Sequence, residues 1–315
     1  MITNAPVLNL AVLANPRAGV LPARQWKRIG MMAMSLVLFS IAPLARASTV
    51  FSTLAAAGPG NFAVLGLQNT FVNLSLVTIN GNAGVSAGGT LDIMAPSVIN
   101  GNVFKDPLAT VTGPGSIHGS IFSPGMSGLD AAVTSASSQA AALAPNLAFS
   151  GITSATTVTG NGGTTVVDVN GNISLNNANL NLSGGPNDFF IINVTGSLSL
   201  VGTAFLGVTG TPLNHVLYNF TGSGITLNTH VGDVLNGIIL VDHGGSSSLD
   251  GSFNGEIIYG GKSVSLLSGA LVTETAAPSV PEPSTLLLMA SGFTLLCIGL
   301  FRRKSSVSLK ALRTR

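Results

Sequence analysis

The sequence predicts an all-β fold, namely a parallel β-helix (a solenoid) with one long α-helix alongside. A pattern of the form apolar-x-Gly-x-apolar returns at steps of 18 to 20 residues, and such a fixed period indicates coils that stack on one another. β-branched residues recur in short runs between Gly and Asn, as is typical of short strands. Residues 127–144 instead space their apolar side chains as a helix does.

The repeat also predicts which side chains face outward. Because side chains alternate along a strand, its first, third and fifth positions should face the interior and its second position the solvent. That second position is polar in every copy, which predicts an outer row and a candidate binding surface. The row consists of Asn80, Asn100, His118, Asn170, Asn236 and Asn254. An alternative is that each Asn-Gly forms a hairpin turn, but the regular spacing favours the solenoid.

The expected helix over residues 127–144 has an apolar stripe made mostly of alanine. Ser127 followed by Asp130 resembles a capping box, and Pro145 ends the run. Since alanine allows close approach, we expect this helix to lie along the solenoid and to cover strand residues.

The order of these parts resembles the ice-binding-like domain family of secreted microbial proteins. The resemblance rests on residues 60–66 (GNFAVLG), residues 79–86 (INGNAGVS) and the alanine-rich helix. It implies a right-handed β-helix with a long helix alongside. Residues 215–220 (HVLYNF), with 236–240 and 254–258, resemble the β-helical surface proteins that commonly carry PEP-CTERM tails.

The C-terminal tail has three parts, which are a Pro-Glu-Pro motif, an apolar run and a basic end. They are Pro281, Glu282 and Pro283, then residues 286–301, then Arg302, Arg303 and Lys304. The run would extend ~24 Å as a helix, somewhat less than the ~30 Å of a bilayer core, so it can only just cross a membrane. The cations predict a cytoplasmic end. The tail resembles the PEP-CTERM sorting signal. An ordinary membrane anchor is the alternative.

The PEP-CTERM resemblance implies an exosortase as processing partner, a transient stay in the inner membrane and release to the cell surface. The other end of the chain predicts export too. Lys27 and Arg28 precede an apolar stretch, and Ala45 and Ala47 form an A-x-A signal cleavage site. We therefore expect an N-terminal signal helix within 1–47, a β-helix domain at 48–275 and a sorting tail with a single transmembrane helix at 276–315.

Charge narrows the range of partners. Residues 48–281 contain two lysines and ten acidic residues, so this part has a net charge of −8. Nucleic acid is excluded as a partner because phosphate binding needs clustered Lys and Arg. Acidic polysaccharides would be repelled, whereas neutral ones would not.

The residues give little sign of catalysis. The acids are scattered, no arginine lies between Arg46 and Arg302, and the single cysteine, Cys297, falls in the apolar run of the tail. A zinc site would need three or four ligands brought together, and the four histidines show no such spacing. We expect no catalytic residue, no metal site and no cofactor, and therefore no enzyme.

The function that the sequence favours is that of a surface or extracellular-matrix protein, structural or adhesive, associated with exopolysaccharide or cell-surface material. Ice binding is the alternative, although rows of the form Thr-Ala/Gly-x-Thr/Asn are missing and the threonines at 153–165 come nearest. A polysaccharide-cleaving β-helix enzyme is the less favoured third class.

Overall fold

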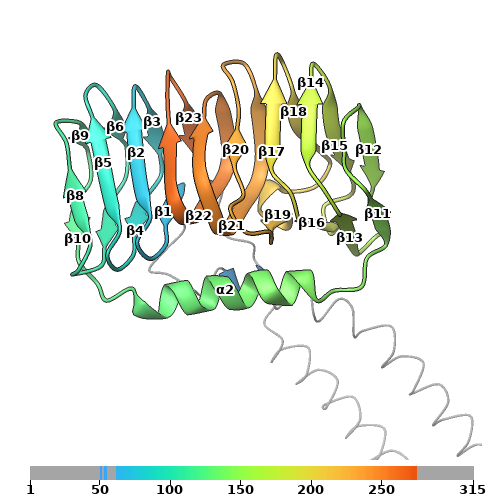
Figure 1. The fold of residues 1–315 in the computed structure, drawn as a ribbon, viewed down its shortest axis with the longest axis horizontal. Coiled ribbons are helices and arrows are strands. Elements are labelled where there is room, and N and C mark those ends of the chain that lie inside the picture. The colour runs from blue at the N-terminus through green and yellow to red at the C-terminus, as the bar shows by residue number, and fades with distance from the viewer. Residues whose placement is uncertain (1–49, 52, 55–61, 275–315) are drawn as a thin grey trace, which may run out of the picture. The chain divides into compact units, whose positions relative to one another are not determined.

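The computed structural model describes residues 50–51, 53–54 and 62–274. Over this part the chain forms a β-solenoid with three faces, and helix α2 (Ser127–Ala141) runs along one of them (Figure 1). All strand pairs are parallel, which confirms the solenoid and leaves no place for Asn-Gly hairpins. The expected signal helix and transmembrane helix lie outside the described residues. Within them, no helix is long and apolar enough to cross a membrane.

The face beneath α2, called the helix face, has ten strand segments. From one end to the other they are β10 (Ile121–Phe122), β7 (Val103–Lys105), β4 (Ala83–Val85), β1 (Val64–Gly66), the middle parts of β22 (Ser252–Leu266) and β21 (Val234–Leu249), β19 (Val216–Phe220), β16 (Phe189–Val194), β13 (Thr164–Val169) and β11 (Leu147–Phe149). A short 3-10 helix, η2 (Leu213–His215), precedes β19.

The next face, called the serine face, follows the same order. It comprises β8 (Thr110–Thr112), β5 (Thr90–Met94), β2 (Phe71–Ser75), the last parts of β22 and β21, β20 (Leu227–Asn228), β17 (Leu198–Val201) and β14 (Ile173–Asn176).

The third face, called the amide face, completes each coil. It comprises β9 (Ser116–Ile117), β6 (Val98–Ile99), β3 (Thr78–Asn80), β23 (Leu271–Thr273), the first parts of β22 and β21, β18 (Phe205–Thr209), β15 (Asn179–Ser183) and β12 (Thr156–Thr159).

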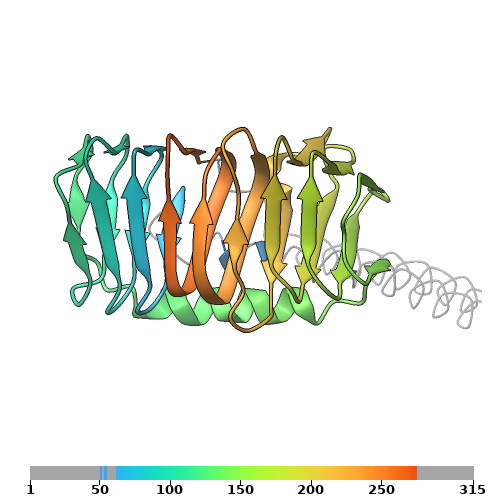
Figure 2. The same cartoon turned by 45° about the horizontal axis from the view of Figure 1, so that its top comes forward.

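The chain does not wind through the solenoid in one pass. A first block, residues 62–122, winds from the middle to one end, and α2 carries the chain back along the body (Figure 2). A second block, residues 147–274, then winds from the other end to the middle. There β22 and β23 pair with β1, β2 and β3, so that orange and blue strands lie side by side in Figure 1. We call this junction of the two blocks the seam.

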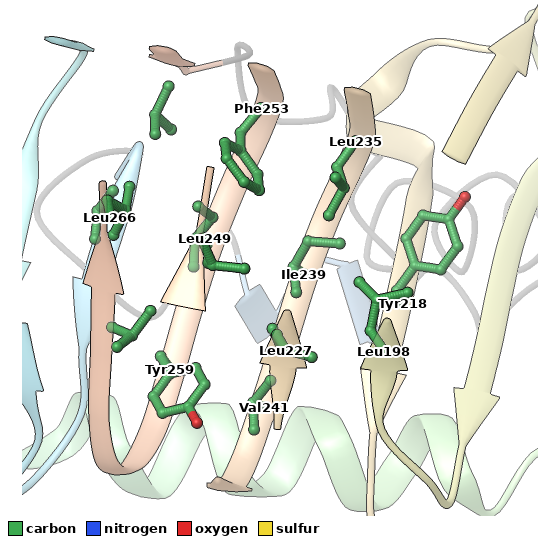
Figure 3. Close-up of a cluster of buried hydrophobic side chains, with 14 of the residues drawn as sticks. Leu198, Tyr218, Leu227, Leu235, Ile239, Val241, Leu249, Phe253, Tyr259 and Leu266 are labelled. Atoms are coloured by element: carbon green, nitrogen blue, oxygen red, sulfur yellow. The ribbon is translucent and has the colours of Figure 1, made fainter. Parts of the chain in front are cut away.

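The interior is filled by the inward side chains of all three faces. Leu198, Leu227 and Ile239 are among those that meet across the interior in Figure 3, and each is at most 2% exposed. The seam leaves no gap in this core, because Val64, Val72 and Ile79 of the first block are fully buried against the second block.

The structure corrects the expectation that the repeat glycines face the interior. The chain turns a corner at each of them, so Ile79 lies in β3 on the amide face while Ala83 lies in β4 on the helix face. The glycines stack upon one another at the corner. A Cβ on Gly101 would collide with the carbonyl oxygen of Gly81, which itself has a positive φ of 147°. Glycine is needed here because successive coils approach through their backbones.

Helix α2 begins at Ser127 as predicted and ends at Ala141, three residues earlier than expected. The predicted capping box is wrong: the residue at the N-cap position, Met126, makes no side-chain cap hydrogen bond. Asp130 instead reaches the solenoid, where Oδ1 accepts a bond from the Gln68 backbone N–H (3.0 Å) and Oδ2 from Ser86 Oγ (2.7 Å). The carboxylate thus fixes the start of the helix to the first block.

The predicted alanine-rich stripe does cover strand residues of the helix face. The buried helix side chains are Leu129, Val133, Ala136 and Ala140, and the strand residues beneath them include Leu65, Ile191, Leu217, Ile238, Leu240 and Ile258. Two asparagines hold the same stripe. Asn219 Nδ2 donates to the Ser137 carbonyl (3.0 Å), and Asn193 Nδ2 donates to the Ala140 carbonyl (3.1 Å). Small side chains on the helix let these amides reach its backbone.

Candidate functional site

The structure brings five of the six predicted outer residues into one row on the amide face. Strand pairing aligns Asn236 with Asn254, Asn254 with Thr273 and Thr273 with Asn80. The row continues to the end of the first block, because the backbone N–H of Asn100 bonds to the Ile79 carbonyl and that of His118 to the Ile99 carbonyl. We call this sequence the amide row: Asn236, Asn254, Thr273, Asn80, Asn100 and His118.

Asn170, the sixth predicted residue, lies elsewhere. It follows β13 at the corner where the helix face ends, and its backbone N–H bonds to the Phe149 carbonyl. Its place in the row is taken by residues that the repeat does not contain. Beyond Asn236 the row continues through Gly207, Asn181 and Thr157. Thr273, Asn181 and Thr157 were missed because no glycine follows them.

Neighbouring amides of the row are hydrogen-bonded along the solenoid axis. Asn100 Nδ2 donates to Asn80 Oδ1 (2.8 Å), Asn254 Nδ2 donates to Asn236 Oδ1 (2.9 Å), and Asn236 Nδ2 donates to the Leu206 carbonyl (3.0 Å). Each primary amide has two N–H donors and two lone pairs on oxygen, so further capacity remains for an outside partner. The coils set the spacing of these groups at ~4.8 Å.

The amide face has no charged side chain on any of its strands. A second row of mixed character runs beside the amide row, and it includes Val98, Thr78, Leu271, Ser252, Val234 and Phe205. Leu271 is 38% exposed. Amides and apolar groups therefore alternate over one regular surface. Neutral sugars match this chemistry, since they combine hydroxyl groups with apolar C–H faces.

A polar groove of about 740 Å³ lies between α2 and the corner of the helix and serine faces. Asp130, Asp242, His243 and Lys262 line it. Asp242 is already engaged, because Oδ1 accepts from Thr134 Oγ1 (3.0 Å) and Oδ2 lies 3.3 Å from His243 Nδ1. With Asp130 bonded to the first block as well, both carboxylates serve to hold the helix.

Two carboxylates that the sequence places 18 residues apart, Glu256 and Glu274, lie on consecutive coils of the second block, next to the seam. Burial raises the pKa of Glu256 to about 8, and the negative charge of Glu274 adds a smaller effect in the same direction. Burial also raises the pKa of Glu274, while a hydrogen bond from the Asn82 backbone N–H (2.9 Å) opposes that effect. The expectation that all acids are scattered is wrong for this pair, because the stacking of coils brings together residues that are distant in the sequence.

Two of the four histidines make structural contacts within the fold. His230 Nδ1 lies 2.7 Å from the Leu200 carbonyl, and His215 stacks on Phe189 with ring centroids 4.1 Å apart. Burial lowers the pKa of His215. No group of three or more His, Cys, Asp or Glu in the described part of the chain is arranged to hold a metal ion.

Several solved structures resemble this fold. An ice-binding protein from an Antarctic bacterium, Flavobacteriaceae, aligns with a TM-score of 0.50 and 14% identity, over 69% of this chain and 47% of its own. The ice-binding protein from the Antarctic ascomycete Antarctomyces psychrotrophicus aligns with a TM-score of 0.49 and 19% identity, over 71% of this chain and 98% of its own. A glycosylated ice-binding protein from an Arctic yeast aligns with a TM-score of 0.48 and 18% identity, over 76% of this chain and 96% of its own. At these identities the likeness concerns the fold alone.

A comparison with curated proteins found no matching sequence. Residues 279–304, in contrast, match the model of the PEP-CTERM protein-sorting motif. These residues contain the Pro-Glu-Pro motif, the apolar run and the three cations of the tail. The chain therefore carries a PEP-CTERM sorting signal, which is typical of exported proteins that an exosortase processes.

Proposed function

We propose that this protein is an exported component of the cell surface or extracellular matrix, whose amide face contacts neutral exopolysaccharide. Export begins with cleavage after Ala47, and an exosortase then acts at the Pro-Glu-Pro motif while the apolar run holds the chain in the inner membrane. The observation that carries the proposal is the amide row itself. It places uncharged hydrogen-bonding side chains at a regular spacing from Asn236 to Asn100.

The electrostatics of the chain favour a neutral partner. With a net charge of −8 over residues 48–281, an acidic polymer would be repelled at low ionic strength. The amide face adds no charge, so its contacts are hydrogen bonds and apolar contacts. Each contributes little by itself, about 0.5–1.5 kcal/mol for a hydrogen bond, and a polymer gains affinity by engaging many coils at once.

The test is retention of the purified protein on the producing strain's exopolysaccharide. The double variant Asn100→Ala, Asn254→Ala removes two amides of the row and should weaken retention by about 5- to 150-fold, which corresponds to the loss of two hydrogen bonds at about 0.5–1.5 kcal/mol each. Asn170→Ala is the matched control, because that exposed amide lies outside the row. Equal retention of both variants and the parent protein would contradict the proposal.

Ice binding is the second candidate, on a different surface. One outward row of the serine face consists of Thr112, Asp92, Asn73, Ser265, Ser248, Asn228, Ser199 and Ser174. Small hydroxyl and amide groups at the same ~4.8 Å spacing could order water, although Asp92 adds a charge. Faceted ice crystals in the presence of the purified protein, lost on Ser248→Asp but not on Asn254→Asp, would favour this candidate.

The enzyme class is tested with the same material. We expect no release of soluble sugar when the protein is incubated with the exopolysaccharide, since the groove carboxylates are already hydrogen-bonded within the fold. Sugar release that depends on Glu256 or Glu274, the two carboxylates next to the seam, would instead establish catalysis there.

A further inference from the structure

The polar groove beside α2 arises because neighbouring coils turn the corner between the helix and serine faces with different numbers of residues. In the coil of β1 four residues, 67–70, make this corner, whereas three residues, 260–262, make it in the paired coil of β22. On the other side four residues, 221–224, make it in the coil of β19, whereas two, 242–243, make it in the paired coil of β21. Two short corners therefore lie between two longer ones, and all four line the groove.

The floor of the groove is bare backbone. Two Gly-Gly pairs, 244–245 and 260–261, lie side by side at the short corners. A Cβ on Gly261 would collide with the neighbouring backbone, so this position cannot carry a side chain. The long corners line the groove with residues 67–68 on one side and 223–224 on the other. A ligand in the groove therefore meets the backbone of the floor directly.

Helix α2 and the short corners contribute charged groups of both signs. Asp130 and Asp242 are bonded within the fold, yet a carboxylate has about four lone-pair sites, so both keep acceptor capacity. His243 belongs to a β-bulge, where two residues of β21 oppose one of β22, and its side chain is 69% exposed. Lys262 is exposed and has no hydrogen-bond or ion-pair partner among the described residues. Its ammonium group offers three donors.

These charges determine which kind of ligand fits. An anion would face two carboxylates, and a cation would face Lys262. A hydroxyl group both donates and accepts hydrogen bonds, so a neutral ligand rich in hydroxyl groups matches the groove best. The volume of about 740 Å³ lies within the range of ~300–1,000 Å³ for small-molecule sites. A free amino acid would match both charges but would fill only a small part of this space.

We propose that this groove binds a short stretch of a neutral sugar chain, whose hydroxyl groups bond to Lys262, His243 and the remaining lone pairs of Asp130 and Asp242. That the chain is the exopolysaccharide rests on the proposed function. The groove itself lies at the corner opposite the amide face, so it is a second contact surface that is tested separately.

Saturation-transfer NMR tests the groove with short neutral oligosaccharides, prepared by partial acid hydrolysis of the producing strain's exopolysaccharide. The full-length protein is purified in a detergent without a sugar headgroup. Lys262→Ala should weaken binding about tenfold or more, because a hydrogen bond to a charged group is lost. Lys105→Ala is the matched control and should bind as the parent protein does. It changes the net charge equally, but Lys105 lies outside the groove, with its Nζ bonded to the Ala109 carbonyl (3.1 Å).

A steric variant gives a second measurement. Ser223 is exposed on a long corner that lines the groove, so Ser223→Trp should fill the groove and abolish binding. An unchanged thermal unfolding midpoint confirms that the fold is retained.

The outcomes separate the groove from the amide face. Binding that survives either Lys262→Ala or Ser223→Trp, or no saturation transfer in the parent protein, overturns the groove proposal. Retention of the intact polymer that still depends on Asn100 and Asn254 would then leave the proposed function standing. Oligosaccharide binding that is lost in the groove variants but kept in Asn100→Ala, Asn254→Ala supports the groove even if the amide row fails its own test.

Discussion

The two buried tyrosines of the core, Tyr218 and Tyr259, differ in whether their hydroxyl groups have hydrogen-bond partners (Figure 3). The hydroxyl of Tyr259 lies 2.7 Å from Ser247 Oγ and 3.0 Å from the Gly245 carbonyl. The hydroxyl of Tyr218 is fully buried and has no hydrogen-bond partner among the described residues, and burial raises its pKa far above the usual value. One hydroxyl therefore stabilises a corner of the solenoid, while the other is an unsatisfied polar group.

This contrast predicts opposite effects of the same substitution. Tyr218→Phe should leave the free energy of unfolding unchanged or raise it by up to about 1 kcal/mol, because it removes a buried group without a partner. Tyr259→Phe should lower it by about 1–2 kcal/mol, because Ser247 and Gly245 lose a partner. Urea unfolding of the two variants measures this. Equal losses in both would mean that the Tyr218 hydroxyl is satisfied.

Glu256 predicts how stability depends on pH. Its folded pKa, raised to about 8 by burial and by Glu274, exceeds the value of ~4.3 expected in the unfolded chain. Between these values the unfolded chain has released its proton and the folded chain retains it, so the free energy of unfolding falls as pH rises and levels off above about 8.

The variant Glu256→Gln removes this dependence. It should gain about 1–3 kcal/mol over the parent protein at pH 8 and nothing at pH 4, a range set below the full pKa difference because the side chain keeps some contact with solvent. Unfolding is followed over pH 4–9, with the exposed-face variant Asp92→Asn as the control. A parent protein whose stability does not change over this range would contradict the assignment.

Among the elements, the corners of the solenoid require glycine, whereas helix α2 does not. A Cβ on Gly101 would meet the Gly81 backbone, whereas a Cβ on Gly128, in helix α2, would meet nothing within 4 Å. Gly101→Ala should therefore lower the free energy of unfolding by about 1–3 kcal/mol through overpacking. Gly128→Ala should raise it by about 0.5–1 kcal/mol, because alanine favours the helix. Thermal unfolding compares the two, and a tolerated Gly101→Ala would contradict the close stacking of the corners.

The sequence predicted these elements better than their order in space. Its 18 to 20 residue period and the alanine stripe of residues 127–144 correctly indicated stacked coils and a covering helix. The period could not reveal that Thr273 lies between Asn254 and Asn80, because the seam joins coils that are distant in the chain. Asn170 matched the repeat but lies at a different corner of the solenoid. The local sequence of a turn is similar at all three corners, so it could not predict which corner Asn170 occupies.

At the scale of the whole molecule, the seam determines where the sorting tail is attached. The backbone N–H of Glu274, the last described residue, bonds to the Asn80 carbonyl (2.9 Å) in the middle of the solenoid, so the described fold finishes there and not at one of its two ends. The other end of the fold begins almost at the expected signal cleavage site. Val50 and Phe51 are fully buried, and the Phe51 ring lies 5.2 Å from that of Phe189. Both free ends of the solenoid are thus built from internal residues.

This arrangement predicts a mature protein that keeps the whole solenoid and loses both targeting segments. Signal cleavage after Ala47 leaves Ser48 and Thr49 ahead of the buried Val50, and cleavage at the Pro-Glu-Pro motif falls after the last residue of the fold. Mass spectrometry of the extracellular fraction should therefore find peptides from residue 48 onward and none beyond about residue 283.

A variant of the sorting motif tests this prediction. In cells that produce the triple variant Pro281→Ala, Glu282→Ala, Pro283→Ala, the protein should stay in the membrane fraction with the cations Arg302 to Lys304 still attached. Pro278→Ala, just upstream of the motif, is the matched control and should be released normally. Recovery of peptides containing Arg302 from the secreted parent protein would show that the tail is retained, and the apolar run would then act as a permanent anchor.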